Sequence, residues 1–300
     1  MNVDILKKKF SVGLCLGEDL SDLYSFFEKY SIWLNNIYFS VPLGRKFYSR
    51  AKLAEEYDGK EDKLICALQS IKELGIRREL TLNTRDLTKD DLDAAIRFCQ
   101  EHSIIPEEIV CLQEYAPYLR HNYPDCELKY SFNNHDIRMQ RVTKEFDSIV
   151  IGKGLLRDME AIKKLAESYR ITYMLNNGCS FMCAGNCGAR NCVSVFDKDI
   201  SKNGIDYTYA RSSIFPSELK EILEKYPETH MFKFKISNRP WGLDFTQKAL
   251  SAYISLEDPI EEMILDTSMF KLFCATNPMD KYEKELQISK ILEYKKGMVL

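Results

Sequence analysis

The sequence lacks the long apolar run that a membrane-spanning helix needs, and we expect no secretory leader. No segment reaches the roughly 18 consecutive apolar residues of a spanning helix. Met1–Phe10 holds three lysines, but no apolar core of signal-peptide length follows them. We therefore expect a cytoplasmic protein without a membrane span.

The chain also has little net charge and few histidines. Its formal net charge is -3, it has 4 histidines, and 29% of its residues are charged. Such a balance gives no global attraction to nucleic acid or to a membrane surface. The sequence contains no ordered Ser–His–Asp set and no metalloprotease helix motif. These absences argue against the common hydrolase classes.

What the sequence does contain is a short β-rich apolar run that recurs, each time followed by a charged segment with helical periodicity. Strands are predicted at Phe10–Leu16, Ile37–Val41, Glu79–Leu82, Ile109–Leu112, Leu128–Phe132, Ser148–Ile151, Ile171–Leu175 and Phe232–Ile236. Helices are predicted at Leu20–Tyr30, Asp62–Leu74, Asp90–His102, Arg157–Ser168, Pro216–Lys225 and, in the tail at 281–300, Lys281–Tyr294. Asp19 and Thr88 are predicted as helix N-caps, and Gly75 as the residue that ends a helix.

Alternation of strands and helices is typical of βαβ units in a parallel sheet. Eight such units predict an α/β protein with a closed (β/α)8 TIM-type barrel, a single domain over residues 1–300. An open doubly wound sheet is the alternative. It is weakened because no Gly-x-Gly-x-x-Gly loop follows the first strand, as a dinucleotide-binding version would require.

Ten cysteines are present, and a disulfide framework is not expected in a reducing cytosol. Four of them, Cys179, Cys183, Cys187 and Cys192, follow the seventh predicted strand with the spacing C-x3-C-x3-C-x4-C. Glycines between them let the backbone bend so that several sulfurs can point at one centre. We therefore predict a metal-binding loop over residues 176–192, at the catalytic end of the barrel.

Thiolates bind zinc and iron–sulfur clusters alike. Structural zinc sites favour paired knuckles, whereas three-residue gaps in one glycine-bearing loop suit a larger cluster at least as well. We predict a 4Fe-4S cluster, with zinc as the alternative. A further alternative is that the four cysteines are buried thiols that bind no metal. A radical S-adenosylmethionine enzyme is a further alternative, although its C-x3-C-x2-C motif usually follows the first strand.

The identity of the fourth cluster ligand stays open between three cysteines, namely Cys192, Cys15 and Cys274. The remaining four are expected to pack rather than to bind metal, because they stand in helical, strand or turn positions without nearby partners: Cys66, Cys99, Cys111 and Cys126.

Polar residues stand at the predicted carboxyl ends of the strands, where barrel enzymes carry their reactive groups. They are Gly17, Glu18, Gly44, Arg45, Asn83, Arg85, Gln113, Glu114, Asn133, Asn134, His135, Lys153, Arg157, Asn176, Asn238 and Arg239. Taken singly, each is an ordinary loop residue or helix cap. Together they predict a polar pocket with amide and cationic groups. Glu114 and His135 are the candidate general acid–base groups, and Asn133 and Arg239 are candidates for orienting a substrate.

Three short segments give the chain a family resemblance. They are Leu80-Thr81-Leu82-Asn83, Ser131-Phe132-Asn133-Asn134, and Lys235-Ile236-Ser237-Asn238-Arg239 with Tyr253 further on. With the cysteines, they resemble the collagenase-like U-32 type peptidase family over roughly Phe10 to Asp258, in particular its short members of anaerobic ubiquinone synthesis. Ser237 and Asn238 stand where that family has Glu and Gly.

The resemblance implies a barrel with a four-iron cluster, oxygen-independent hydroxylation of a small aromatic quinone precursor or a nucleobase, and a possible heterodimer with a second family member. The first hypothesis is therefore an iron–sulfur oxidoreductase of this kind. The second is a non-enzymatic barrel with a structural metal loop that acts as a partner or maturation subunit. The third is a peptidase, which lacks support because no nucleophile–base pair is visible.

Overall fold

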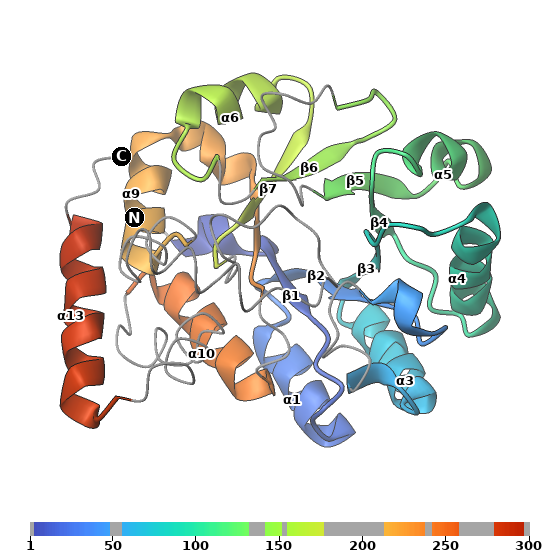
Figure 1. The fold of residues 1–300 in the computed structure, drawn as a ribbon, viewed down its shortest axis with the longest axis horizontal. Helices are drawn as coiled ribbons and strands as arrows, with labels where there is room; N and C mark the ends of the chain where they lie inside the picture. Colours follow the sequence, from blue (N-terminus) through green and yellow to red (C-terminus); the bar gives the residue numbers. More distant parts are fainter. Residues whose placement is uncertain are drawn as a thin grey trace.

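Eight parallel strands close into a barrel in which each strand pairs with its neighbours in chain order (Figure 1). The computed structural model describes residues 3–48, 56–131, 142–151, 155–176, 213–237, 242–257 and 279–296. The strands are β1 (Phe10–Gly13), β2 (Leu34–Phe39), β3 (Arg77–Leu82), β4 (Glu108–Cys111), β5 (Glu127–Ser131), β6 (Ser148–Ile151), β7 (Arg170–Met174) and β8 (Lys233–Lys235). The predicted barrel is confirmed, and each predicted strand has its counterpart.

Helices surround the barrel and cover the outer face of its sheet (Figure 1). They are α1 (Leu20–Tyr30), α3 (Glu61–Glu73), α4 (Lys89–Glu101), α5 (Ala116–Asn122), α6 (Met159–Ala166), α9 (Pro216–Lys225), α10 (Gly242–Ser255) and α13 (Lys281–Lys296), with 3-10 turns at Val3–Leu6, Arg45–Phe47 and Pro227–Met231. Helices α5 and α10 are not among those predicted. None of the helices in the described ranges is long and apolar enough to cross a membrane.

Strand β1 ends earlier than the sequence predicts, at Gly13 instead of Leu16. The Leu14 N–H still donates to the Tyr38 carbonyl of β2 at 3.0 Å. The Leu16 N–H donates instead to the carboxylate of Glu56 at 2.9 Å. Leu14 and Leu16 stay buried after the chain has left the sheet. Their burial explains why the apolar run in the sequence is longer than the strand.

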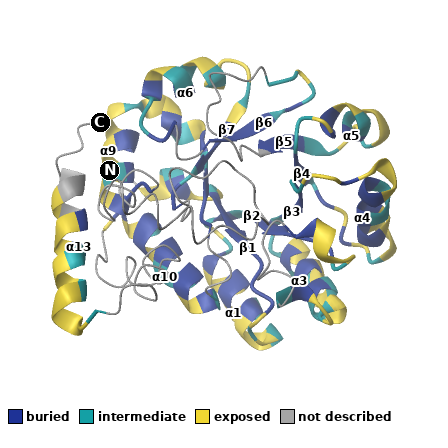
Figure 2. Cartoon of the chain, in the orientation of Figure 1, coloured by how far each residue is buried: buried dark blue, intermediate teal, exposed yellow. Residues whose placement is uncertain are grey.

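Two layers of side chains fill the molecule, one on each side of the sheet. Apolar strand residues such as Phe10, Ile37 and Ile109 are fully buried, and the helices turn their buried faces toward the sheet (Figure 2). The alternate strand positions point into the barrel, because successive side chains of a strand lie on opposite faces. Several of those interior positions hold charged residues, such as Glu79, Glu108 and Lys129.

The three predicted helix boundaries form at the predicted residues. Gly75 ends α3 with a φ of 62°, and the Ile76 N–H donates to the Ile71 carbonyl at 3.1 Å, the bond that closes a Schellman turn. Thr88 caps α4 in a reciprocal pair with Asp91. Asp19 occupies the N-cap position of α1 as predicted, although its side chain makes no capping hydrogen bond.

Replacing Thr88 by alanine is expected to lower the free energy of unfolding by about 1 kcal/mol. The Thr88 hydroxyl accepts the Asp91 N–H at 3.3 Å, and the Asp91 carboxylate accepts the Thr88 N–H at 2.9 Å. Urea titration of Thr88→Ala and of Thr88→Ser checks this, since serine keeps the hydroxyl. An equal loss in both variants would contradict a capping role.

Candidate functional site

The end of β7 and the end of β8 are joined at the carboxyl-terminal mouth of the barrel, the end where the strand carboxyl termini lie. Asn176 pairs with Ser213 in an isolated antiparallel bridge. The Asn176 side-chain oxygen also accepts the N–H of Ser237, just beyond β8, at 2.7 Å. The Ser237 hydroxyl donates to the Asn176 carbonyl. Asn176, Ser213 and Ser237 are all buried.

Neighbouring side chains fix the returning strand of this bridge. The Arg157 guanidinium donates to the Ser213 carbonyl at 2.8 Å and binds the Glu218 carboxylate at 2.6 and 3.0 Å. The Tyr253 hydroxyl of α10 donates to the Ile214 carbonyl at 2.6 Å. The chain therefore leaves the barrel at Asn176 and returns at Ser213, beside the point of departure. We call this arrangement, made by Asn176, Ser213 and Ser237, the neck.

In the sequence, Asn176 and Ser213 of the neck flank residues 177–212, which include all four clustered cysteines. Cys179, Cys183, Cys187 and Cys192 lie outside the described residues, as do His135, Asn133, Arg239 and Cys274. Their predicted roles stay predictions. The donor set itself fits a thiolate-bound metal centre, because four cysteines stand within 14 consecutive residues of the sequence.

Of the candidate acid–base groups and cluster ligands, the structure describes Glu114 and Cys15. Glu114 follows β4 and is exposed. Cys15 is 2% exposed, and its thiol lies 3.8 Å from the Thr246 hydroxyl of α10. This contact places Cys15 in the core beside α10, and its predicted part as an alternative fourth ligand stays untested. Among the described residues, no group of three metal-ligating side chains comes together.

The cysteines that were expected to pack divide into three groups. Cys99 and Cys111 are buried, and burial raises the pKa of the Cys99 thiol to about 12, so these thiols stay neutral. Cys126 is half-buried, and its thiol donates to the Pro106 carbonyl at 3.4 Å. Cys66 is exposed on α3, so the prediction that it packs is wrong. Helix α3 buries Leu64, Ala67, Leu68 and Ile71, and Cys66 falls on its opposite side.

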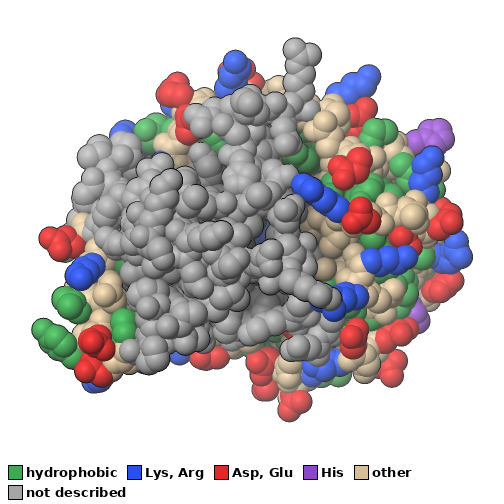
Figure 3. Space-filling view, in the orientation of Figure 1, with side chains coloured by type: hydrophobic (Ala, Val, Ile, Leu, Met, Phe, Trp, Pro, Cys, Tyr) green, Lys and Arg blue, Asp and Glu red, His purple; other side chains and the backbone are tan. Residues whose placement is uncertain are grey.

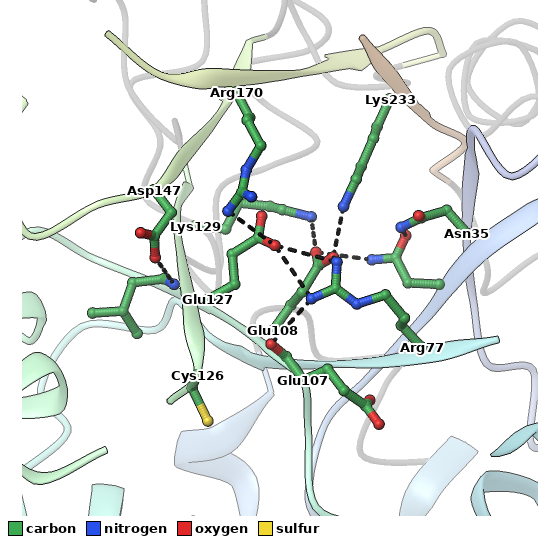
Figure 4. A network of polar contacts seen from close by, with 12 residues as sticks. Asn35, Arg77, Glu107, Glu108, Cys126, Glu127, Lys129, Asp147, Arg170 and Lys233 are labelled. Atoms are coloured by element: carbon green, nitrogen blue, oxygen red, sulfur yellow. Dashed lines mark hydrogen bonds and ion pairs between the residues drawn. The ribbon is translucent and has the colours of Figure 1, made fainter. Parts of the chain in front are cut away.

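Below the mouth, the barrel interior holds a network of buried charges that the sequence reasoning missed (Figure 4). Lys129 of β5 is fully buried and binds two buried carboxylates, Glu79 at 2.6 Å and Glu108. Lys233 of β8 reaches Glu108 at 2.7 Å, and Lys235 reaches Glu79 at 2.8 Å. Because β8 is not a neighbour of β3 or β4, these contacts cross the interior of the barrel.

Cations and carboxylates stabilise each other's charged forms in this network. Burial alone would raise the pKa of Glu79, but the ammonium groups of Lys129 and Lys235 outweigh it and hold that pKa below its usual value. Burial would lower the pKa of Lys129, but Glu79 and Glu108 raise it above its usual value. The pKa of Glu108 is lowered despite its burial, with Lys129 as the main cause. The network is therefore ionised at neutral pH.

The network reaches solvent at the amino-terminal end of the barrel, which is opposite the mouth. Arg77 and Arg170 each bind Glu127 at 3.2 Å, and Arg77 also binds Glu108 (Figure 4). The Arg170 side chain is 61% exposed, whereas that of Glu127 is 8% exposed. Charged side chains thus occupy this end of the barrel.

A period-two alternation of charged and apolar residues within the strands could have revealed the network. It is visible in Glu127-Leu128-Lys129 and in Lys233-Phe234-Lys235. Strands of a parallel sheet usually carry near-continuous apolar runs, because both of their faces are buried. The alternation instead indicates a barrel with an ionic interior.

No family model and no curated protein matches the chain. Among solved structures, it is similar to a GH113 beta-1,4-mannanase, with 11% identity over 89% of this chain and 99% of that chain and a TM-score of 0.46. It is similar to a GH113 beta-mannanase from Alicyclobacillus acidocaldarius, with 14% identity over 90% of this chain and 97% of that chain and a TM-score of 0.44. An alpha-amylase from Lactobacillus plantarum has 9% identity over 98% of this chain and 81% of that chain, with a TM-score of 0.42.

Such distant likenesses give no substrate for this chain. The barrel itself is established by the strand pairing. Over the described part of the face in Figure 3, basic and acidic side chains are interspersed, as on an ordinary solvated surface.

Proposed function

We propose that the chain is a barrel enzyme in which Cys179, Cys183, Cys187 and Cys192 hold an iron–sulfur cluster at the mouth. The observation that carries this proposal is the neck. It anchors both ends of the cysteine-bearing segment beside the carboxyl ends of β7 and β8. Barrel enzymes build their active sites at this end of the strands.

The chemistry that such a cluster supplies is electron transfer, which suits oxygen-independent hydroxylation or a related modification of a small aromatic or a nucleobase. The residues of the chain would bind and orient that substrate. Four protein thiolates leave no iron open for direct ligation of substrate. The proposal is therefore an oxidoreductase with an outer-sphere role for the cluster.

The resemblance to the U-32 type family belongs to the same proposal. Two residues of the motif that carries it, Lys235 and Tyr253, have defined places in the structure. Lys235 binds Glu79 in the barrel interior, and Tyr253 holds Ile214 beside the neck. Lys235 belongs to β8, which leads into Ser237 of the neck, and Tyr253 belongs to α10.

Anaerobically purified protein is expected to be brown and to contain about four irons and four sulfides per chain. Absorption spectroscopy with iron, sulfide and zinc analysis tests this. One zinc per chain without iron would contradict the proposal and favour a structural metal loop in a non-enzymatic partner protein. Protein without any bound metal would contradict both.

A further inference from the structure

Lys235 is the member of the ionic network that lies nearest the neck along the chain. It stands two residues before Ser237, which makes the neck's contacts to Asn176. Two residues of a strand span about 6.6 Å. The Lys235 ammonium is held by Glu79 at 2.8 Å and lies 4.0 Å from the centre of the Tyr38 ring. The Tyr38 hydroxyl donates to the Ile236 carbonyl at 2.8 Å, so the ring is fixed as well.

Thr81 faces the same part of the interior, one inward position closer to the mouth than Glu79. Its side chain lies on the same side of β3 as that of Glu79, because strand positions two apart share a face. Thr81 is 8% exposed, and within the described part of the chain its hydroxyl oxygen has no hydrogen-bond partner. A buried hydroxyl without a protein partner needs a water or a ligand to satisfy it.

From this juxtaposition we propose that Lys235 and Thr81 form a subsite for the carboxylate group of a small-molecule substrate. This inference rests on the proposed function and deepens it by naming a class of substrate for the same mouth. Lys235 donates a charge-assisted hydrogen bond, and Thr81 donates a neutral one. Glu79 and Tyr38 already fix the Lys235 ammonium, so the Lys235 side chain loses little conformational freedom when the carboxylate binds.

The donor set favours a carboxylate over a phosphate. One ammonium and one hydroxyl match the two oxygens of a carboxylate. Phosphate sites usually gather more donors, such as backbone N–H groups or a forked guanidinium.

Benzoate is the probe for this subsite, and benzamide is its neutral counterpart. Titration calorimetry on the full, anaerobically purified chain is expected to show benzoate binding at least about tenfold more tightly than benzamide. Inorganic phosphate should bind more weakly than benzoate. Lys235→Met should lower the affinity for benzoate by at least about tenfold. Thr81→Val, which keeps every charge, should lower that affinity by about threefold or more.

Lys233→Met is the matched control, because Lys233 lies on the same strand and also binds a buried glutamate, but at the far end of the interior. It should leave benzoate affinity within about twofold of the unsubstituted chain, since it lies away from the mouth. Unchanged affinity in both Lys235→Met and Thr81→Val would overturn the subsite, as would no benzoate binding or equal binding of benzoate and benzamide.

Iron analysis of the same samples separates this inference from the proposed function. Iron-loaded protein that does not bind benzoate would refute the carboxylate subsite but not the cluster proposal. Iron-free protein that binds benzoate through Lys235 would refute the cluster and keep the subsite. If Lys235→Met fails to fold, the Thr81→Val result decides, because this substitution leaves the ionic network intact.

Discussion

Replacing Lys129 by methionine is expected to lower the free energy of unfolding by about 3–5 kcal/mol. The substitution removes the ammonium that bridges Glu79 and Glu108, two carboxylates whose side chains are fully buried. Glu79 keeps Lys235, Glu108 keeps Lys233 and Arg77, and the neutral Asn36 amide still donates to both. None of these cations bridges the two carboxylates as Lys129 does, so their mutual repulsion is less well compensated. Removal of one member of a buried ionic group costs more than the group contributes as a whole.

Urea titration measures this loss, with Lys281→Met as the matched control. Lys281 makes an i,i+4 pair with Glu285 on α13, and its side chain is 93% exposed. Exposed pairs of this kind contribute less than about 1 kcal/mol. If the two substitutions had similar small effects, the barrel interior would be far better solvated than the burial of Lys129 indicates.

The pH dependence of this loss follows from the direction of the pKa shifts. In the native chain the pKa values of Glu79 and Glu108 are lowered, so their stabilisation is present above the unfolded value and is lost as the pH falls through the folded one. The raised pKa of Lys129 keeps its contribution at every pH below its unfolded value. Without Lys129, burial raises the carboxylate pKa, and protonation then relieves the repulsion. The difference in stability between the two proteins should therefore be smaller at pH 5 than at pH 7, and an equal difference would contradict this account.

The barrel was predictable because its outward strand positions are apolar and regularly spaced. Ile37, Ile109 and Ile171 each mark a strand and are buried against the helices. The helix boundaries at Thr88 and Gly75 could be predicted because they depend on local hydrogen bonds and on one backbone angle. Such features need no knowledge of distant residues.

The ionic interior could not be predicted by the same reasoning, because it depends on contacts between distant strands. Glu108 and Lys233 are far apart in the sequence, and their 2.7 Å contact exists only after the barrel closes. From the local sequence alone, a charged residue in a strand is predicted to face solvent. Only closure of the barrel turns that face inward, where the charges must be paired.

The neck was partly predictable. The sequence predicts Asn176 and Arg157 as polar residues at the ends of two different strands, the seventh and the sixth. Their partners Ser213 and Glu218 lie beyond the cysteine segment. No spacing rule connects residues across a segment of that length. The sequence could place the cysteines after the seventh strand, and the structure adds that the segment starts and ends at one place.

Replacing Cys179 by alanine is expected to abolish the brown colour, the bound iron and the catalytic turnover together. A cubane cluster needs its full set of protein ligands, and alanine offers no donor. The barrel should remain folded, because the neck is made by Asn176, Ser213 and Ser237, and the described members of the ionic interior include no cysteine either. Iron analysis, visible absorption and a urea titration on the same preparation measure the three consequences.

Cys66→Ala is the matched control for this experiment, since Cys66 is an exposed thiol on α3, on the outside of the barrel. It should keep the iron content, the colour and the activity of the unsubstituted chain. Full iron content in Cys179→Ala would show that this thiol is not a ligand and would direct attention to Cys15 and Cys274. Loss of iron together with loss of the folded barrel would instead mean that the metal stabilises the fold, as a structural centre does. Loss of iron from an intact barrel is the outcome that separates an electron-transferring cluster from a structural one.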